Sequence, residues 1–138
     1  MLVTGGAGFI GSHLVDKLLT EGKEVSVIDD LSTGDASNLA SAQAHPRFHL
    51  VRGSILDADI IRPLVAEADF IYHLAAAVGV DLVVRQPVHT IEDNVRGSET
   101  MLAAAFQHRV PILITSTSEV YGKSEQPQFR EEIGRAHV

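Results

Sequence analysis

The sequence has 138 residues, of which 45% are apolar, so it can form one domain with a buried core. A formal net charge of −7 disfavours nucleic acid and anionic membranes as main partners, because both attract clustered Lys and Arg. The chain has no cysteine, no membrane-length apolar run and no signal-peptide pattern. We therefore expect a cytoplasmic protein without a disulfide framework or a metal site.

The first elements are a strand, a glycine turn and a helix. An apolar run at residues 1–4 predicts the strand, and Gly5, Gly8 and Gly11 follow at a spacing of three. A helix is expected from Phe9 to Glu21. Its apolar face would hold Phe9, Ile10, Leu14, Leu18 and Leu19. Glycines at such a turn let backbone N–H groups approach a pyrophosphate, and the third lets the helix pack closely on the strand. The pattern predicts a dinucleotide site.

The second predicted strand, residues 24–28, ends at two acidic residues. Asp29 lies eighteen positions after Gly11. An acidic residue there can accept hydrogen bonds from the adenosine ribose of NAD and repel the 2′-phosphate of NADP. Asp29 and Asp30 could instead only end the strand and open a turn. Because the glycine turn lies upstream, we favour the ribose-binding role and NAD.

Helices and strands alternate through the rest of the chain. Helices are expected at residues 36–44, 58–66 and 87–108, and strands at residues 47–53, 68–74 and 110–115. Asp57 is a candidate N-cap. Near-continuously apolar strands indicate a parallel sheet covered by helices on both faces. The prediction is an α/β fold, a Rossmann-type doubly wound parallel sheet of order 3-2-1-4-5 that is incomplete at its C-terminal side. Its ligand crevice would lie at the carboxyl ends of the first and fourth strands.

Two features next to that crevice are informative. Small residues at 75–80 would let a flat ligand lie close to the backbone, although ordinary close packing explains them too. Asn94 lies amid the apolar face of the long helix. We expect it to brace a neighbouring loop, because burying an unpaired amide costs roughly 2 kcal/mol; the alternative is a solvent-exposed side chain. The expected buried face consists of Val88, Ile91, Val95, Met101, Leu102, Ala105 and Phe106.

Taken together, these residues resemble the extended short-chain dehydrogenase/reductase family, in its nucleotide-sugar epimerase/dehydratase/decarboxylase branch. The resemblance is carried by residues 3–14, 27–34, 72–76, 94–97 and 116–122, and it reaches about residue 132. Residues 1–132 are therefore expected to be a partial NAD-binding Rossmann domain.

The resemblance implies NAD as the cofactor and a set of residues that would bind it. Phe9 and Ile10 would lie at the pyrophosphate, and Ser54 and Ile55 would flank the adenine. The family usually has an acidic residue where Ser54 stands. The full set is Gly5, Gly8, Phe9, Ile10, Gly11, Asp29, Asp30, Leu31, Ser32, Thr33, Gly34, Ser54, Ile55, Leu74, Ala75, Ala76, Asn94 and Thr115.

The resemblance also implies a chemistry. In this family NAD takes hydride from C4 of a nucleotide sugar, which gives a 4-keto intermediate. Thr117, Ser118 and Glu119 fall at catalytic positions, and the Thr117 hydroxyl would bond the C4 oxygen; alternatively, Thr117 is a turn residue that satisfies backbone groups. Residues 116–119 resemble the UDP-glucuronate decarboxylases. Ser118 replaces the Asp of dehydratases, which disfavours dehydration, whereas a 4-epimerase stays open.

The chain departs from the family at one point. Neither Tyr72 nor Tyr121 has a Lys four positions on, so the catalytic Tyr-x-x-x-Lys pair is missing. We expect an N-terminal fragment that turns over no substrate, from a parent that forms a homodimer and acts on a nucleotide sugar. Residues 133–138 match a translated sequencing adapter and are expected to be a non-native tail. The alternatives are a complete, non-catalytic NAD-binding module and a degraded gene.

Overall fold

In the part of the chain that the structure describes, five strands form one parallel sheet of order β3-β2-β1-β4-β5, which confirms the predicted order. The structure is a computed structural model that describes residues 1–77, 84–85 and 87–121. The expected non-native tail at residues 133–138 lies outside the described residues. No helix within those described ranges is both long and apolar enough to cross a membrane.

The elements follow the predicted alternation. The strands are β1 (Leu2–Thr4), β2 (Val25–Asp29), β3 (Phe48–Arg52), β4 (Ile71–His73) and β5 (Ile112–Ile114). The helical segments are α1 (Phe9–Thr20), η1 (Ala36–Leu39), α2 (Ala40–Gln43), α3 (Ala58–Ala66), α5 (Pro87–His108) and η2 (Ser118–Tyr121). Thr4 is in register with Ile28 on one side and with His73 on the other, so β1 and β4 end at the same level and β2 runs one residue further.

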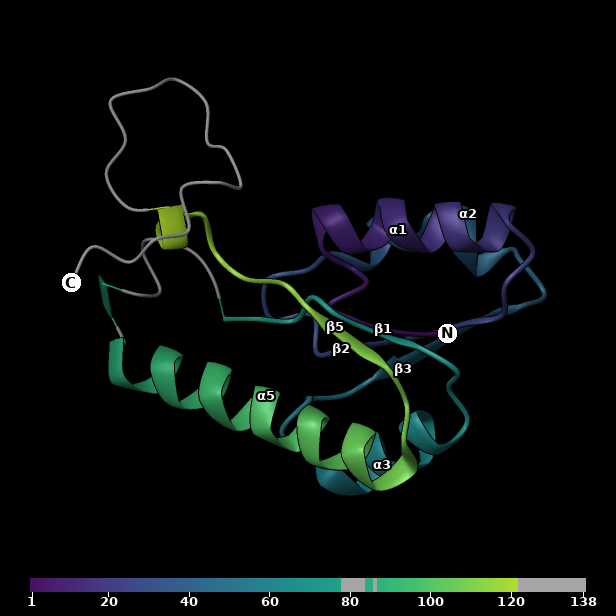
Figure 1. Cartoon of the computed structure of the whole chain (residues 1–138). Helices are drawn as coiled ribbons and strands as arrows, with labels where there is room; N and C mark the ends of the chain where they lie inside the picture. Colours follow the sequence, from purple (N-terminus) through teal and green to yellow (C-terminus); the bar gives the residue numbers. More distant parts are fainter. Residues whose placement is uncertain (78–83, 86, 122–138) are drawn as a thin grey trace.

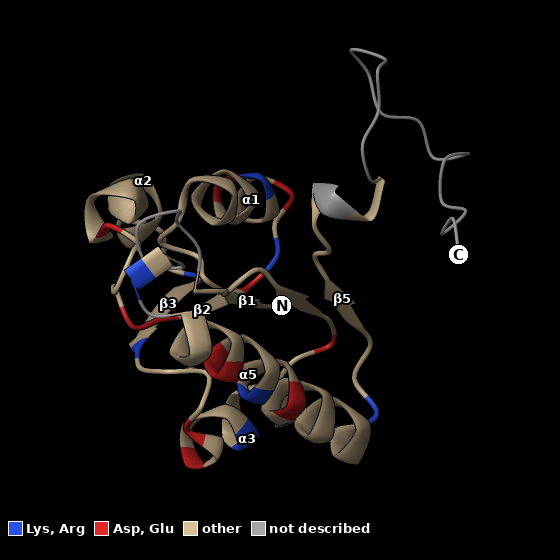
Figure 2. Ribbon diagram, turned by 90° about the vertical axis from the view of Figure 1, so that its left-hand side faces the viewer, with Lys and Arg blue, Asp and Glu red and all other residues tan. Residues whose placement is uncertain are grey.

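The sheet lies between two helical layers (Figures 1 and 2), with α1 and α2 on one face and α3 and α5 on the other. Side chains alternate along a strand, so Val3 points into one layer and Leu2 into the other. The core under α1 and α2 contains Val3, Ala7, Val15, Leu18, Leu19, Val25, Val27, Leu39 and Ala42. The core under α3 and α5 contains Leu2, Ile28, Ile61, Val65, Ile71, Met101, Ala104 and Ala105.

Helix caps account for two of the boundaries. Asp57 Oδ1 accepts the N–H groups of Asp59 at 3.0 Å and Ile60 at 3.4 Å, which confirms the predicted N-cap of α3. The single helix expected at residues 36–44 is instead a 3-10 turn, η1, followed by the short α2. Asp35 caps η1 by accepting the Ser37 N–H at 2.8 Å. Hydrogen bonds from Ser37 also lower the pKa of Asp35.

The predicted apolar face of α1 is partly wrong. Leu18 and Leu19 are buried as expected, but Phe9 is 78% exposed and Ile10 is 68% exposed. Both lie in the first turn of α1. The buried side of α1 consists of Gly11, Ser12, Val15, Leu18 and Leu19.

The predicted buried face of α5 is also wrong for most of its members. Met101 and Ala105 are buried, but Val88, Ile91, Val95, Leu102 and Phe106 are between 46% and 87% exposed. The buried residues of α5 are Thr90, Gly97, Met101, Ala104 and Ala105. A Cβ added at Gly97 would lie 2.4 Å from Ile55 Cδ1, so α5 packs through its small residues. The helix carries two apolar stripes, and periodicity alone does not say which one faces the sheet.

Candidate cofactor site

The crevice lies where the strand order reverses, at the carboxyl ends of β1 and β4. From β1 the chain crosses to β2 on one side of the sheet, while β4 lies on its other side. The glycine turn after β1 therefore meets the segment after β4. Gly5 has φ +70°, and a Cβ added there would lie 2.8 Å from the Cα and N atoms of Ala75. Ligands of doubly wound sheets bind at such switch points.

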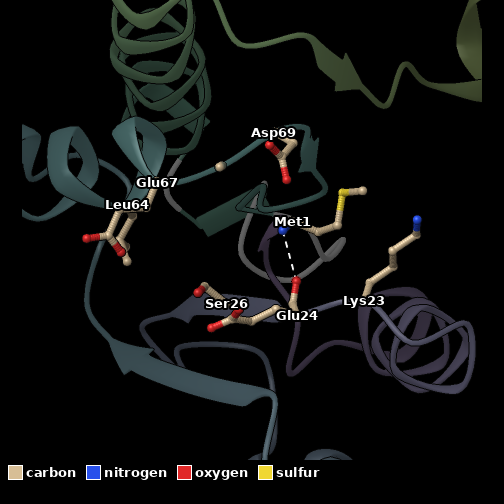
Figure 3. Close-up of a pocket in the computed structure, with 8 residues that line it drawn as sticks. Met1, Lys23, Glu24, Ser26, Leu64, Glu67 and Asp69 are labelled. Carbon is tan, nitrogen blue, oxygen red and sulfur yellow. Dashed lines mark hydrogen bonds between the residues drawn. The ribbon is translucent and has the colours of Figure 1, made fainter.

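A different hollow lies at the opposite end of the sheet. It measures about 270 Å³ and includes Met1, Glu24, Glu67 and Asp69 in its lining (Figure 3). The Met1 amino group donates to the Glu24 carbonyl oxygen at 2.9 Å. Across the part of the chain that the structure describes, no three His, Asp or Glu side chains could hold a metal ion. Because the hollow lies at the end of the sheet opposite the crevice, its residues do not line the crevice.

Glycine is required at the positions of this turn for different physical reasons. A Cβ at Gly11 would lie 2.2 Å from the Gly5 carbonyl oxygen, and one at Gly6 would lie 2.5 Å from Val27 Cγ1. Packing alone therefore requires a glycine at both positions. Gly8 is the exception: its φ is −75°, and an added Cβ would meet only the Gly5 oxygen, at 3.3 Å. Packing and backbone conformation therefore constrain Gly8 less than the other glycines of the turn.

The start of α1 presents its backbone amides beside the glycine turn. Gly8 is the N-cap and has no side chain that could cap the helix. The N–H groups of Phe9, Ile10 and Gly11 have no hydrogen-bond partner among the described residues. Unpaired amides at a helix N-terminus, together with the helix dipole, favour an anionic group. The exposed side chains of Phe9 and Ile10 flank these amides.

Asp29 joins the end of β2 to the glycine turn. Its Oδ2 accepts the Ala7 N–H at 2.8 Å, and its Oδ1 accepts the Leu31 N–H at 2.9 Å, while the residue is only 8% exposed. A carboxylate has about four acceptor positions. Two therefore remain for further donors such as ribose hydroxyls. Asp29 thus ends the strand and shapes a turn, and this does not exclude a ribose-binding role.

The loop after Asp29 is held in an unusual conformation. Leu31 has φ +62°, a left-handed conformation that costs a side-chain-bearing residue roughly 1–2 kcal/mol. The bond from its N–H to Asp29 offsets that cost. Asp30 Oδ1 accepts both the N–H and the hydroxyl of Ser32, at 2.9 and 2.6 Å. Thr33 is exposed, and a Cβ at Gly34 would lie 3.0 Å from Ala7 Cβ, so this loop returns to the glycine turn.

Ser54 and Ile55 are engaged in contacts of their own. Ser54 Oγ accepts the Leu56 N–H at 3.2 Å, and Ile55 lies against Gly97 of α5. Both side chains are only partly exposed. Their expected place beside an adenine stays a prediction.

The segment after β4 is held by two polar side chains. Thr4 Oγ1 lies 2.7 Å from His73 Nδ1 and accepts the Ala75 N–H at 3.1 Å. Burial lowers the pKa of His73, so its ring is neutral at pH 7. Asn94 Oδ1 accepts the Ala77 N–H at 2.7 Å, and Asn94 Nδ2 donates to the Ala77 carbonyl oxygen at 3.1 Å. The predicted bracing role of Asn94 is confirmed. Leu74, Ala75 and Ala76 form the stretch between these two anchors.

The predicted catalytic segment follows β5. Both the N–H and the hydroxyl of Thr115 lie 3.4 Å from the His73 carbonyl oxygen, which ties the ends of β4 and β5 together. Thr117 is exposed at the same end of the sheet, and Ser118 and Glu119 begin η2. The side chains of Ser118 and Glu119 lie outside what the structure describes. The catalytic roles of all three residues therefore stay predictions.

Sequence reasoning missed four residues that build the site. Thr4 and His73 anchor the segment after β4, whereas Asn38 Nδ2 donates at 2.8 Å to the carbonyl oxygen of Ala7. These bonds join residues that are 69 and 31 positions apart. No local pattern could indicate such pairs.

Comparisons with known proteins identify the family. The family model for GDP-mannose 4,6 dehydratase matches residues 2–135. The chain belongs to this family. The match confirms the resemblance to extended short-chain dehydrogenases/reductases that act on nucleotide sugars.

Relatives of this chain include UDP-glucuronic acid decarboxylases. The chain is 47% identical over 129 residues to UDP-glucuronic acid decarboxylase 1 of Arabidopsis thaliana, which covers 93% of this chain and 28% of the relative. It is 40% identical over 138 residues to UDP-glucuronic acid decarboxylase 1 of Xenopus tropicalis, covering 99% of this chain and 32% of the relative. The chain thus spans about a third of the length of the curated relatives that it matches.

Solved structures of family members share the fold. A dTDP-glucose 4,6-dehydratase from Streptomyces venezuelae with NAD bound matches with a TM-score of 0.86 and 38% identity, covering 95% of this chain and 43% of that one. The UDP-glucose 4-epimerase from Thermotoga maritima matches with a TM-score of 0.79 and 35% identity, covering 91% of this chain and 40% of that one. The match to such structures confirms the Rossmann-type fold.

Proposed function

We propose that this chain is the NAD-binding portion of a nucleotide-sugar-modifying enzyme that works through a 4-keto-sugar intermediate. The observation that carries the proposal is the pair of unpaired amides of Phe9 and Ile10, which follow Gly8, an N-cap without a side chain. A pyrophosphate fits this cradle because a side chain at residue 8 would fill the space it needs. Asp29 retains acceptors for a ribose at the neighbouring strand end.

The finer reaction is proposed as decarboxylation of UDP-glucuronate, with UDP-sugar 4-epimerisation as the alternative. The decarboxylase relatives and the sequence at residues 116–119 support the first. Bound NAD supplies the acceptor for the hydride from the sugar. Thr117 is proposed to hold the sugar C4 oxygen by a hydrogen bond, with Ser118 and Glu119 beside it. Thr115 is proposed to hold this segment against β4.

We further propose that these 138 residues bind NAD without turning over a sugar, because the sequence holds no Tyr-x-x-x-Lys pair. This pair supplies the base in the family that the chain resembles. The same feature favours a second candidate, a non-catalytic NAD-binding module. The coding sequence downstream of Glu132 separates the two: a Tyr-x-x-x-Lys pair within the next few tens of codons supports the enzyme, and a genomic stop codon supports the module.

Isothermal titration of the 138-residue chain with NAD and NADP tests the binding proposal. We expect NAD to bind more tightly than NADP, and we expect Asp29→Asn to weaken NAD binding. Asp69→Asn serves as the matched control, because Asp69 is an exposed carboxylate at the opposite end of the sheet. Absence of binding at millimolar NAD would overturn the proposal.

For assembly, we propose that the parent protein is a homodimer. An exposed apolar stripe on α5 supports this, because contiguous apolar surface of that kind marks interaction sites. The stripe consists of Val88, Ile91, Val95, Leu102 and Phe106.

A further inference from the structure

Ala7 is the residue through which the two halves of the proposed NAD site meet. It is fully buried, and both of its backbone polar groups are bonded to residues far along the chain. Its N–H donates to Asp29 Oδ2 at 2.8 Å. Its carbonyl oxygen accepts the Asp35 N–H at 3.1 Å and the Asn38 side-chain amide at 2.8 Å. A carbonyl oxygen has two lone pairs, so this acceptor is fully used.

The carbonyl of Ala7 controls the direction of the next amide. The C=O of Ala7 and the N–H of Gly8 belong to one peptide unit, which is planar. The Gly8 N–H donates to the Gly5 carbonyl oxygen at 3.2 Å. Holding the Ala7 oxygen therefore fixes the plane that leads into the N-cap of α1, and with it the amides of Phe9 and Ile10.

We infer that Asn38 is a positioning residue of this site: by donating to the Ala7 carbonyl, it holds the glycine turn ready for a pyrophosphate. The inference rests on the proposed function. Asn38 lies on η1, and its donation to Ala7 spans 31 positions. The loop from Asp29 to Asn38, the proposed ribose side, thereby braces the proposed pyrophosphate side. Because the bonds of the turn are in place before the ligand arrives, binding need not include the cost of ordering it.

The test compares Asn38→Asp with the wild-type chain. The substitution keeps the shape of the side chain, but it replaces the amide donor by a carboxylate oxygen that repels the Ala7 carbonyl. Asn38→Ala removes the donor without repulsion and serves as the second variant. Ser41→Ala on α2 is the matched control, because its side chain is exposed and next to the same segment. Circular dichroism reports whether each variant folds.

Titration with NAD, ADP and adenosine separates a positioning role at the phosphate-binding turn from a general loss of ligand affinity. We expect Asn38→Asp to weaken NAD and ADP about tenfold, the scale of one lost hydrogen bond. Adenosine lacks the phosphates, so its affinity should change less than about twofold. Equal losses for adenosine and ADP would overturn the inference, as would unchanged ADP affinity.

Hydrogen exchange of the free chain supplies a readout without ligand. We expect the amides of Ala7 and Gly8 to exchange at least about tenfold faster in both Asn38 variants, with α3 amides unchanged. Unchanged exchange at Ala7 and Gly8 would overturn the inference. A wild-type chain that binds no NAD would instead overturn the proposed function and any role of Asn38 at that site. If the wild-type chain and Asn38→Asp bind NAD equally well, this inference is overturned while the proposed function stands.

Discussion

The hydroxyl oxygen of Thr4 lies 2.7 Å from Nδ1 of His73, a contact that joins the carboxyl ends of β1 and β4. The same oxygen accepts the Ala75 N–H at 3.1 Å. The hydroxyl has one hydrogen to donate, and Nδ1 of a neutral ring is an acceptor within reach of it. When the hydroxyl donates to Nδ1, the proton of the neutral ring lies on Nε2. Protonating the ring would place a charge in this buried position, which burial disfavours, as the lowered pKa of His73 indicates.

The first prediction is a loss of stability in mild acid. Burial makes the pKa of His73 lower in the folded chain than in the unfolded one, where it is about 6.5. The unfolded state therefore binds more protons as the pH falls. Stability from this residue is complete above about pH 6.5, decreases below it, and levels off below the folded pKa. Urea unfolding between pH 7.5 and 5 measures the slope.

His73→Asn is the comparison for that prediction. Its side-chain oxygen can accept from Thr4 in place of Nδ1 but does not titrate in this range. The free energy of unfolding should therefore fall less steeply with acid in the variant than in the wild-type chain. Identical slopes would show that His73 does not contribute to the pH dependence.

The second prediction contrasts two glycines of one turn. Gly8→Ala should change the free energy of unfolding by less than about 1 kcal/mol, because its φ is ordinary and its Cβ would meet only the Gly5 oxygen, at 3.3 Å. Gly11→Ala should cost about 3 kcal/mol or more, because its Cβ would lie 2.2 Å from the Gly5 oxygen. Gly8→Ala should nevertheless weaken NAD binding. Full NAD affinity in that folded variant would contradict a pyrophosphate in front of Gly8.

The third prediction concerns the clamp on Ala77. Asn94→Asp retains the oxygen that accepts the Ala77 N–H but loses the donor to the Ala77 carbonyl. Asn94→Ala loses both bonds. We expect the free energy of unfolding to fall in the order wild type, Asp, Ala, with about 1–3 kcal/mol for Ala. Exchange of the Ala77 amide should accelerate in Asn94→Ala and not in Asn94→Asp, and equal acceleration in both would contradict the assigned bonds.

Local signals were sufficient to predict much of the fold. The N-cap Asp57 and the periodicity after it predicted α3 with its observed bounds, Ala58–Ala66. The alternation of apolar strands and helices predicted the strand order, and the point where that order reverses indicated the ends of β1 and β4 as the place of the crevice.

What the sequence did not reveal depends on contacts between distant residues. The bond from Asn38 to Ala7 needs the loop after β2 to return over the glycine turn, and spacing carries no record of that return. The incorrect prediction of the buried face of α5 has a similar origin. Its large residues predict a buried side, but a Cβ at Gly97 would already lie 2.4 Å from Ile55, so the helix packs here through a residue without a side chain.

The last prediction follows from that face of α5. Val88, Ile91, Val95, Leu102 and Phe106 form an exposed apolar stripe, which we define as the α5 stripe. Apolar surface of this kind promotes association, because contact removes it from water. The 138-residue chain should therefore self-associate in a concentration-dependent way. Sedimentation velocity over a hundredfold range of concentration measures this.

A charge placed within the α5 stripe should reverse that behaviour. Ile91→Glu puts a carboxylate at a position that is 64% exposed, so the fold should tolerate it while contact across the stripe becomes costly. Gln107→Glu adds the same charge on the same helix at an exposed position outside the stripe, and it should associate like the wild-type chain. A wild-type chain that sediments as a sharp monomer at high concentration, or association that persists in Ile91→Glu, would show that the stripe does not mediate contact between copies.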